Sequence, residues 1–310
     1  MRAVIQNSFG DPNVLHVAEV SRPEPIPSEV LVRVHAAAVN PVDAMVRSGA
    51  FPLLGEPPFI LGWDISGVVE QVVPGVTRFE VGDEVFGMPF FPRAGRGYAE
   101  YVAVPSRQLA RKPAALGHEH AAALPLAGLT AWQALVDTAD VRPGQRVLIH
   151  AGGGGVGHLA VQIAKARGAH IIATASAAKH DFVRALGADE VVDHRHPDAT
   201  TAVREADVVL DTVGGAVGHR SIRQLRPGGL LVTIVDRADT ALRAATIASG
   251  RRFAGVTVEP DHVGLEALAD LADSGRLRPH IEHSFQLEDA AKAHELIESG
   301  RTRGKIVLTV

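Results

Sequence analysis

The chain of 310 residues contains no cysteine. Disulfide bonds and thiolate metal sites are therefore excluded. Long apolar runs are also missing, since none approaches the ~20 residues that a membrane-spanning helix needs. The N-terminal residues become polar too early for a signal peptide. We therefore expect a cytoplasmic protein that has no membrane partner.

A surplus of basic residues is missing as well. The 31 Lys and Arg residues are balanced by 35 Asp and Glu residues, and the formal net charge is −4. This balance gives no electrostatic basis for binding nucleic acid. What the chain does contain is 46% hydrophobic residues and 31 glycines, which favours a turn-rich α/β protein with large buried cores. At about 150 residues per domain, the length predicts two domains.

Residues 1–124 are predicted to be rich in β-strands, because short β-branched runs alternate with Gly, Pro and Asp turns. The expected strands are Ala3–Ile5, Val30–His35, Ile65–Val73, Glu84–Gly87 and Ala99–Val104. In the last part of the chain, the pattern indicates helices at Gly264–Ala272 and Leu287–Glu298 and a final strand at Lys305–Val310. Because that strand is isolated, we expect it to rejoin the N-terminal region, so that residues 1–124 and 256–310 form one domain.

Residues 125–255 show a different pattern, in which strand-like and helix-like segments alternate. Such alternation predicts βαβ units and a doubly wound parallel sheet. The expected strands are Arg146–His150, His170–Ala175, Glu190–Val192, Val208–Asp211 and Leu230–Val235. The expected helices are Gly157–Arg167, Ala178–Leu186 and His219–Leu225.

The glycine cluster after the first strand of this region is the most informative segment. Gly152, Gly154 and Gly157 fit a G-x-G-x-x-G frame that leads directly into a helical pattern. Such a frame lets the backbone approach a diphosphate, while free N–H groups and the helix dipole favour the phosphates. The order of strand, glycines and helix therefore predicts a Rossmann dinucleotide site that includes Gly155 and Val156.

The segment that selects NAD or NADP lies at the end of the second strand, about 20 residues past the glycines. An Asp or Glu there would bind the 2′-hydroxyl of NAD, yet no acidic residue occurs between Gly157 and Asp181. The strand end instead offers the hydroxyl of Ser176, free N–H groups and the ammonium of Lys179. These groups suit a phosphate, so we predict NADP(H) as the cofactor. The alternative is that Lys179 is an ordinary solvated residue.

Further motifs are spread along the chain at Val39–Asp43, Arg47–Gly49, Leu61–Gly67, Gly82–Gly87, Gly97–Tyr101, Leu124–Trp132 and Arg303–Val307. Together with the glycine fingerprint, they make the chain resemble the zinc-free quinone oxidoreductase branch of the medium-chain dehydrogenase/reductase superfamily. The resemblance implies a GroES-like N-terminal catalytic domain, a Rossmann NADP(H)-binding domain and a cleft between them. It also implies homodimers that pair edge strands, here through Arg252–Val258.

The resemblance implies cofactor contacts only where residues match. It places Thr130 beside the nicotinamide, and it places Ser176 and Lys179 at the 2′-phosphate. His194 stands where relatives often have a tyrosine near the adenosine. The alternative for Thr130 is an ordinary helix hydroxyl. The full expected cofactor set is Thr130, Gly152, Gly154, Gly155, Val156, Gly157, Ser176, Lys179, His194, Thr212 and Val235.

Asn40 falls beside the nicotinamide and the substrate in this resemblance. Zinc-using relatives have a cysteine near this position and a His-Glu pair after Gly62, whereas this chain has Trp63-Asp64 there. We therefore expect no metal, and alcohol oxidation is disfavoured because no Lewis acid would stabilise an alkoxide. The alternative for Asn40, which precedes a proline, is a turn-forming role. Histidine pairs that could in principle bind a metal read as polar surface residues: His118 with His120, and His194 with His196.

Without a metal, hydride transfer from NADPH suits an acceptor that spreads negative charge by itself, such as a quinone or an activated enone. Asn40 would donate a hydrogen bond to the developing oxyanion. Phe51 and Trp63 would supply flat apolar walls of the substrate site, although Trp63 equally suits core packing. We therefore expect a quinone oxidoreductase-type enzyme with a small-molecule substrate.

Two alternative functions stay open. The first is an enoyl-thioester reductase, but that branch uses a tyrosine as proton donor near the position of Phe51. The second is a non-catalytic NADPH-binding sensor or structural protein, because a fold alone does not prove activity.

Overall fold

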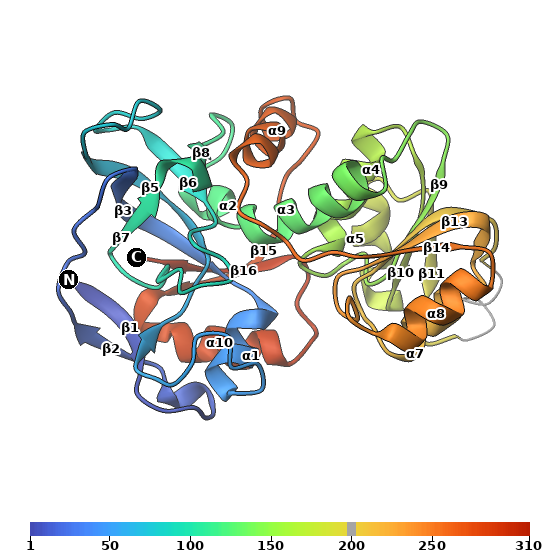
Figure 1. The fold of residues 1–310 in the computed structure, drawn as a ribbon, viewed down its shortest axis with the longest axis horizontal. Helices are drawn as coiled ribbons and strands as arrows, with labels where there is room; N and C mark the ends of the chain where they lie inside the picture. Colours follow the sequence, from blue (N-terminus) through green and yellow to red (C-terminus); the bar gives the residue numbers. More distant parts are fainter. Residues whose placement is uncertain (197–202) are drawn as a thin grey trace. The chain divides into compact units, whose positions relative to one another are not determined.

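The computed structural model describes residues 1–196 and 203–310, and the chain divides into two compact units (Figure 1). Unit 1 comprises Met1–Leu129 and Glu259–Val310, and unit 2 comprises Thr130–Val258. Both units combine helices with sheets, which confirms the predicted α/β class. Within the described residues, no helix combines the length and the apolar character needed to span a bilayer.

Unit 2 is built around a parallel sheet that has six strands in the described part of the chain. In spatial order the strands are β11 (Glu190–Asp193), β10 (His170–Ala175), β9 (Arg146–Ile149), β12 (Ala206–Asp211), β13 (Leu225–Thr233) and β14 (Arg252–Gly255). Val147, Leu148 and Ile149 of β9 are fully buried, as expected where helices cover both faces of a parallel sheet. The chain moves outward from β9 to β10 and β11, and it then returns to β12 on the other side of β9. Ligands of such sheets bind at this reversal, beyond the carboxyl ends of the strands.

The helices of unit 2 connect its strands. The described helices are α4 (Gly157–Ala166), α5 (His180–Ala185), α7 (Ala216–Ser221) and α8 (Thr240–Ala248). Because such crossovers are right-handed, α4 and α5 cover one face of the sheet, and α7 and α8 cover the other. A further helix, α3 (Pro125–Trp132), begins in unit 1 and ends in unit 2.

The predicted helix at His219–Leu225 is wrong in its position. Helix α7 spans Ala216–Ser221, and Leu225 already belongs to β13. Gly214 and Gly215 both have positive φ, so the chain turns there and the helix begins earlier than the apolar pattern indicated. A register irregularity near the start of β13 accommodates the proline within that strand.

Unit 1 contains a larger sheet in the order β15-β16-β3-β5-β6-β8, and β7 also pairs with β3. These strands are β15 (Ile281–Gln286), β16 (Lys305–Thr309), β3 (Glu29–Val39), β5 (Asp64–Val72), β6 (Glu84–Gly87), β8 (Leu109–Arg111) and β7 (Tyr101–Pro105). A smaller sheet contains β2 (His16–Glu19), β1 (Arg2–Gln6) and β4 (Phe59–Ile60). The helices are α1 (Pro41–Ser48), α2 (His118–Ala122), α9 (His262–Asp273) and α10 (Ala290–Glu298). Val32, Ile65 and Val85 on β3, β5 and β6 belong to the core and are fully buried.

The predicted return of the last strand to the N-terminal β-region is confirmed. Strand β16 pairs antiparallel with β3, with Ile306 opposite Val39 and Thr309 opposite Ala36. Strand β5 pairs with the other side of β3, so β3 lies between β16 and β5. The neighbouring strand β15 escapes sequence analysis, because most of its residues are polar and none is fully buried.

The glycine that begins α4 offers a test of how tightly helix and strand pack. A Cβ atom on Gly157 would lie 2.2 Å from the carbonyl oxygen of Ala151 and 2.9 Å from Cα of Gly152. We expect Gly157→Ala to lower the free energy of unfolding by about 1–3 kcal/mol, because the backbone must shift to admit the methyl group. Urea denaturation measures this effect.

The matched control is Gly117→Ala. No atom lies within 4 Å of a Cβ atom at Gly117, and its φ is not positive. Because Gly117 is an N-cap, this substitution should change stability by only about 0.5–1 kcal/mol. Equal losses for the two variants would show that the space around Gly157 is not what matters.

Candidate functional site

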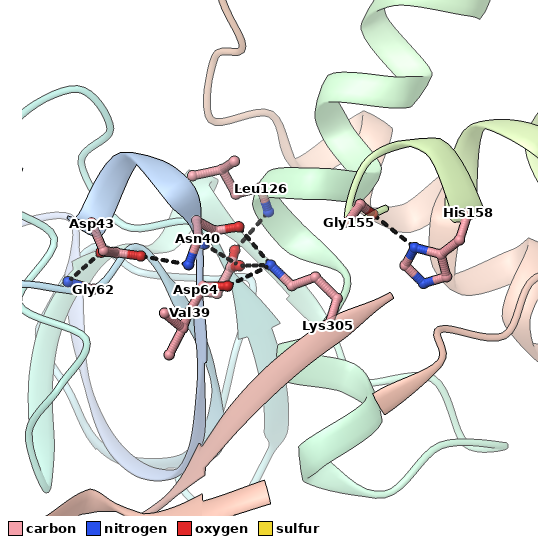
Figure 2. Close-up of polar contacts among 9 residues, drawn as sticks. All are labelled: Val39, Asn40, Asp43, Gly62, Asp64, Leu126, Gly155, His158 and Lys305. Atoms are coloured by element: carbon pink, nitrogen blue, oxygen red, sulfur yellow. Dashed lines mark hydrogen bonds and ion pairs between the residues drawn. The ribbon is translucent and has the colours of Figure 1, made fainter. Parts of the chain in front are cut away.

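Three neighbouring strands of unit 1 bring together polar residues that are far apart in the sequence (Figure 2). Ile306 of β16 pairs with Val39 of β3, so Lys305 lies opposite the residue that follows β3, which is Asn40. On the other side of β3, Asp64 at the start of β5 pairs with Ala38. The side chains of Lys305, Asn40 and Asp64 are only 2%, 2% and 0% exposed, respectively.

The buried side chains form a connected set of hydrogen bonds. Nζ of Lys305 donates to Oδ1 of Asn40 at 2.5 Å and to the carbonyl oxygen of Val39 at 3.2 Å. The same nitrogen lies 3.3 Å from Oδ2 of Asp64. Nδ2 of Asn40 donates to Oδ2 of Asp64 at 2.8 Å. The backbone N–H of Leu126 donates to Oδ1 of Asp64 at 2.6 Å. Asn40 therefore lies between a cation and an anion, which meet opposite ends of its amide.

The backbone of Asn40 is held just as firmly. Asn40 is the N-cap of α1, and Pro41 follows at the first helical position. The N–H of Asn40 donates to Oδ2 of Asp43 at 2.8 Å, while the N–H of Asp43 donates to the carbonyl oxygen of Asn40 at 3.0 Å. Oδ1 of Asp43 accepts a hydrogen bond from the N–H of Gly62 at 3.1 Å. The backbone of Asn40 thus caps α1, while its side chain is engaged with Lys305 and Asp64.

The electrostatics of this site are dominated by burial. Burial raises the pKa of Asp43 to about 7, and the nearby Asp64 adds to the rise, while N–H groups and Lys305 oppose it. Burial also raises the pKa of Asp64, against the opposing effects of Lys305, Asn40 and the N–H of Leu126. Two carboxyl groups and one ammonium therefore share a water-poor interior, where each charge interacts strongly with its neighbours.

The second group of candidate residues lies in unit 2, in the turn between β9 and α4. The N–H of Gly152 donates to the carbonyl oxygen of Thr174 at 2.8 Å, which ties the turn to β10. Gly154 closes a tight turn onto the carbonyl oxygen of Ala151 at 2.9 Å. The turn is followed by Gly155, by the N-cap Val156 and by Gly157 as the first residue of α4. These residues have the strand–turn–helix context that a dinucleotide fingerprint requires.

A histidine that sequence analysis missed stabilises this turn. Nδ1 of His158 lies 2.8 Å from the carbonyl oxygen of Gly155 (Figure 2). It also lies 2.9 Å from the carbonyl oxygen of Gly154. Because carbonyl oxygens only accept hydrogen bonds, Nδ1 must carry the proton in these contacts. The side chain is fully buried and fixes the peptide groups of the turn from within unit 2.

The predicted 2′-phosphate residues lie beside the same turn. Ser176 directly follows β10, and its carbonyl oxygen accepts a hydrogen bond from the N–H of Lys179 at 2.8 Å. The aliphatic part of Lys179 packs over Gly153, where a Cβ atom would lie 3.0 Å from Cδ of the lysine. His194 is exposed, and its backbone N–H donates to the carbonyl oxygen of Ala175 at 3.3 Å. The ends of β10 and β11 therefore bring Ser176 and His194 to one edge of the sheet.

The other predicted cofactor residues differ in how exposed they are and in whether their polar groups already have hydrogen-bond partners. Thr212 follows β12, but its hydroxyl donates to the carbonyl oxygen of His150 at 2.8 Å. Val235 lies beyond the carboxyl end of β13 and is 46% exposed. Thr130 is buried within α3. All predicted cofactor residues belong to unit 2, whereas Asn40, Phe51 and Trp63 belong to unit 1.

The two predicted apolar walls of the substrate site differ in exposure. Phe51 is half-buried in the segment after α1, where its N–H donates to the carbonyl oxygen of Met45 at 3.1 Å. Trp63 is fully buried, donates from Nε1 to the carbonyl oxygen of Arg93 at 2.6 Å, and contacts Phe91 edge to face. This environment fits the core-packing alternative for Trp63.

Of the histidine pairs considered as metal ligands, the first has a member engaged in other contacts and the second is exposed. Nδ1 of His118 lies 2.8 Å from the hydroxyl of Ser66, and its ring stacks on His35 at 4.4 Å between centroids. His194 and His196 are exposed. In residues 1–196 and 203–310, no group of three or more His, Cys, Asp or Glu side chains is arranged to hold a metal ion.

Sequence analysis also missed Asp64, Lys305 and Asp43 as partners of Asn40. A signal existed for the capping pair, because Asn-Pro-Val-Asp has the spacing of a reciprocal N-cap. A weaker signal was Asp64 itself, a carboxylate within an otherwise apolar run. Only the strand pairing brings Lys305 to the same place.

The raised pKa of Asp43 predicts a pH-dependent stability. Between the unfolded value of 3.8 and the folded value of about 7, the folded chain holds a proton that the unfolded chain has released. The stabilisation that comes from this bound proton is fully present below the unfolded pKa of 3.8, and it is lost as the pH rises through the folded pKa of about 7. In this window we expect Asp43→Asn to remove a slope of about 1.4 kcal/mol per pH unit from the free energy of unfolding.

Urea denaturation at successive pH values measures the slope of wild type and variant. Asp11→Asn is the control, because Asp11 is exposed on unit 1. A wild-type slope that persists in Asp43→Asn would contradict the assignment, even if the variant is less stable throughout.

Two protein-family models match segments of the chain. Residues 26–114 match the alcohol dehydrogenase GroES-like domain. Residues 186–308 match the zinc-binding dehydrogenase family.

Similar curated proteins cover most of the chain. It is 32% identical to the quinone oxidoreductase of Homo sapiens over an alignment of 326 residues, gaps included. The alignment covers 99% of this chain and 97% of that protein. The chain is 34% identical to the human protein named NAD(P)H oxidoreductase RTN4IP1, mitochondrial, over 92% of this chain and 82% of that protein. It is also 39% identical to a segment of polyketide synthase GfsB from Streptomyces halstedii, which covers 91% of this chain but 5% of the synthase.

Solved structures show the same fold. The quinone oxidoreductase from Coxiella burnetii superposes with a TM-score of 0.94 at 38% identity, covering 100% of this chain and 99% of that one. The Escherichia coli quinone oxidoreductase complexed with NADPH gives a TM-score of 0.89 at 28% identity, with both chains fully covered. The chain therefore belongs to the medium-chain dehydrogenase/reductase superfamily of oxidoreductases, in its quinone oxidoreductase branch.

Proposed function

We propose that this protein is an NADPH-dependent oxidoreductase that transfers hydride to a quinone or an activated enone without a metal. The observation that carries the proposal is the Asn40 amide, buried between Lys305 and Asp64. It is a fixed neutral hydrogen-bond donor near the position where zinc-using relatives have a cysteine. Relatives named quinone oxidoreductase, one of them complexed with NADPH, support the same activity.

The cofactor would bind to unit 2 along the carboxyl edge of its sheet. The N–H groups of the turn from Gly152 to Gly157, at the start of α4, suit the diphosphate. Lys179, which packs along that turn, and Ser176 would meet the 2′-phosphate. The remaining contacts of the proposed site are Thr130, His194, Thr212 and Val235.

The metal-free part of the proposal is supported by charge. An ammonium lies 2.5 Å from Oδ1 of Asn40 and 3.3 Å from Oδ2 of Asp64. These are the oxygens that a hard cation would need as ligands. A divalent ion could approach them only against the repulsion of Lys305, in an interior that screens it poorly.

The residues of unit 1 would act on the substrate rather than on the cofactor. When bound, NADPH supplies the hydride. Asn40 donates a hydrogen bond to the acceptor oxygen on which negative charge develops. Phe51 provides an apolar surface that excludes water, which strengthens this hydrogen bond. A quinone or enone suits such a site because it delocalises much of the charge by itself.

We also propose that the protein forms a homodimer in the cytoplasm. Strand β14 (Arg252–Gly255) is an edge strand of the unit 2 sheet as described. A free edge of this kind can pair with the same strand of a second copy.

Enoyl-thioester reduction stays the second candidate. It is favoured by the 39% identity to a segment of a polyketide synthase. Against it stands Phe51, which has no acidic proton to deliver where that branch uses a tyrosine. A non-catalytic NADPH-binding role is the third candidate and is separated from both by turnover.

The cofactor assignment is tested by Lys179→Ala. We expect NADPH binding to weaken by about 1–3 kcal/mol, whereas NADH binding hardly changes, because only the 2′-phosphate needs the ammonium. Titration calorimetry with both coenzymes measures the difference, and the exposed Lys292 provides the control Lys292→Ala. Equal losses for NADPH and NADH would remove Lys179 from the phosphate site.

The reaction itself is tested by following NADPH consumption with para-benzoquinone, methyl vinyl ketone and crotonyl-CoA. We expect turnover with the quinone or the enone, and a loss of about 100-fold in kcat for Asn40→Ala, the magnitude typical of a lost oxyanion donor. The exposed Asn13 provides the control Asn13→Ala, which should keep full activity. Turnover of crotonyl-CoA alone would favour the enoyl-thioester alternative. NADPH binding without any turnover would refute an enzymatic role.

A further inference from the structure

The Asn40 amide can serve as a donor only if its NH2 group, and not its oxygen, faces the acceptor. The two ends of a carboxamide have almost the same shape, so packing alone discriminates poorly between an amide and its flipped form. A flipped amide would present a carbonyl oxygen to the developing oxyanion and would repel it. The site therefore needs a device that fixes the orientation of this side chain.

Lys305 and Asp64 provide such a device through the chemistry of their end groups. An ammonium can only donate hydrogen bonds, so the amide end 2.5 Å from Nζ must be the oxygen. Oδ2 of Asp64 also faces Nζ of Lys305, and its Oδ1 accepts from the N–H of Leu126. This carboxyl group therefore acts as an acceptor, and the amide end 2.8 Å from its Oδ2 is the nitrogen. A flip would place oxygen against oxygen and N–H against ammonium. Both unfavourable contacts would form at once, inside the protein.

This orientation leaves one hydrogen of the amide available. Nδ2 of Asn40 carries two N–H bonds, and Asp64 accepts one of them. Within the described ranges, no acceptor meets the second N–H. The backbone of Asn40 is fixed at the same time by the reciprocal bonds with Asp43. The second N–H thus has a defined direction before any substrate binds.

The ammonium of Lys305 also changes the hydrogen-bond strength of the second N–H of the Asn40 amide. A hydrogen bond from Lys305 to Oδ1 draws electron density from the amide and makes its N–H groups better donors. The carboxylate of Asp64 accepts on the N–H that is not offered to substrate. Lys305 therefore increases the positive character of the remaining N–H, although its own ammonium is only 2% exposed.

We propose that Lys305 and Asp64 are positioning residues of the reductase, which orient and polarise the Asn40 amide for the substrate oxygen. The inference rests on the proposed function, because it requires a substrate whose oxygen gains negative charge. It assigns no contact with substrate or cofactor to either residue. All effects of Lys305 on the hydride transfer then pass through Asn40.

A purely structural role makes a different prediction about combined variants. If Lys305 only stabilises the fold, its removal lowers activity independently of Asn40, and the losses multiply in the double variant. If it acts through Asn40, its removal has no further effect once the amide is gone. The double-variant comparison therefore separates the two roles.

The experiment measures kcat and KM for the quinone in wild type, Asn40→Ala, Lys305→Met and the double variant, with NADPH affinity measured separately. We expect Lys305→Met to lower kcat by about tenfold or more with unchanged NADPH affinity, because a misaligned donor loses part of the oxyanion stabilisation. The double variant should be no slower than Asn40→Ala. The control Lys292→Met removes an exposed ammonium that pairs with Asp289 and should leave kcat unchanged.

Multiplied losses in the double variant, or full activity of Lys305→Met, would overturn the positioning role while leaving the proposed function intact. Wild-type protein that binds NADPH but reduces no quinone or enone would refute the proposed function and the positioning role together. Thermal denaturation reports whether each variant folds. If Lys305→Met does not fold, Lys305→Arg takes its place. It keeps a cation but moves its donors, and its loss of kcat should likewise disappear in the Asn40→Ala background.

Discussion

A buried ammonium beside a buried carboxylate is the constraint on which the unit 1 site depends. Lys305 and Asp64 are 2% and 0% exposed, and desolvating such ions costs several kcal/mol each. Their mutual attraction and the hydrogen bonds from Asn40 and Leu126 offset this cost. Removing one partner of such a pair costs about 3–5 kcal/mol, yet apolar residues of similar volume can be at least as stabilising as the pair. Stability alone therefore does not account for the charges, whereas the orientation of the amide between them does.

The same constraint links the chemistry of the site to the completion of the fold. Lys305 and Asn40 are separated by 265 residues, and they meet only when β16 pairs with β3. The intervening chain includes the whole of unit 2, whose βαβ contacts are local in sequence. The dinucleotide turn can form from neighbouring segments, but the amide site requires the last strand of the chain. A substitution in β16 can thus disturb the orientation of Asn40 from a distant position in the sequence.

Contacts between residues close in sequence could be predicted from the sequence, whereas contacts between distant strands could not. The glycine turn is readable because Gly152, Gly154 and Gly157 stand next to their strand and helix, and the fold class follows from the alternation of apolar segments. The partners of Asn40 are not readable, because Lys305 and Asp64 come from strands whose register no local pattern specifies. His158 is missed for another reason, since its role depends on the direction of two carbonyl groups. The misplaced helix at His219–Leu225 shows the same limit, because consecutive glycines moved the start of α7 without changing the apolar pattern.

The charge pattern around Asn40 also bears on which acceptors such a site can serve. A metal ion places a full charge beside the reacting oxygen and can stabilise an alkoxide. Here the cation is separated from that oxygen by the amide, so the substrate would meet only a polarised N–H. One hydrogen bond of this kind suffices for a weakly basic, delocalised anion, but it does not offset the free-energy cost of forming a strongly basic, localised one. A hydroquinone anion or an enolate spreads its charge over a ring or an allylic system, and it therefore needs less from the protein. In the proposed site, the burial of Lys305 behind Asn40 would therefore favour electron-poor acceptors over simple carbonyl compounds, through distance and geometry rather than through the size of the site.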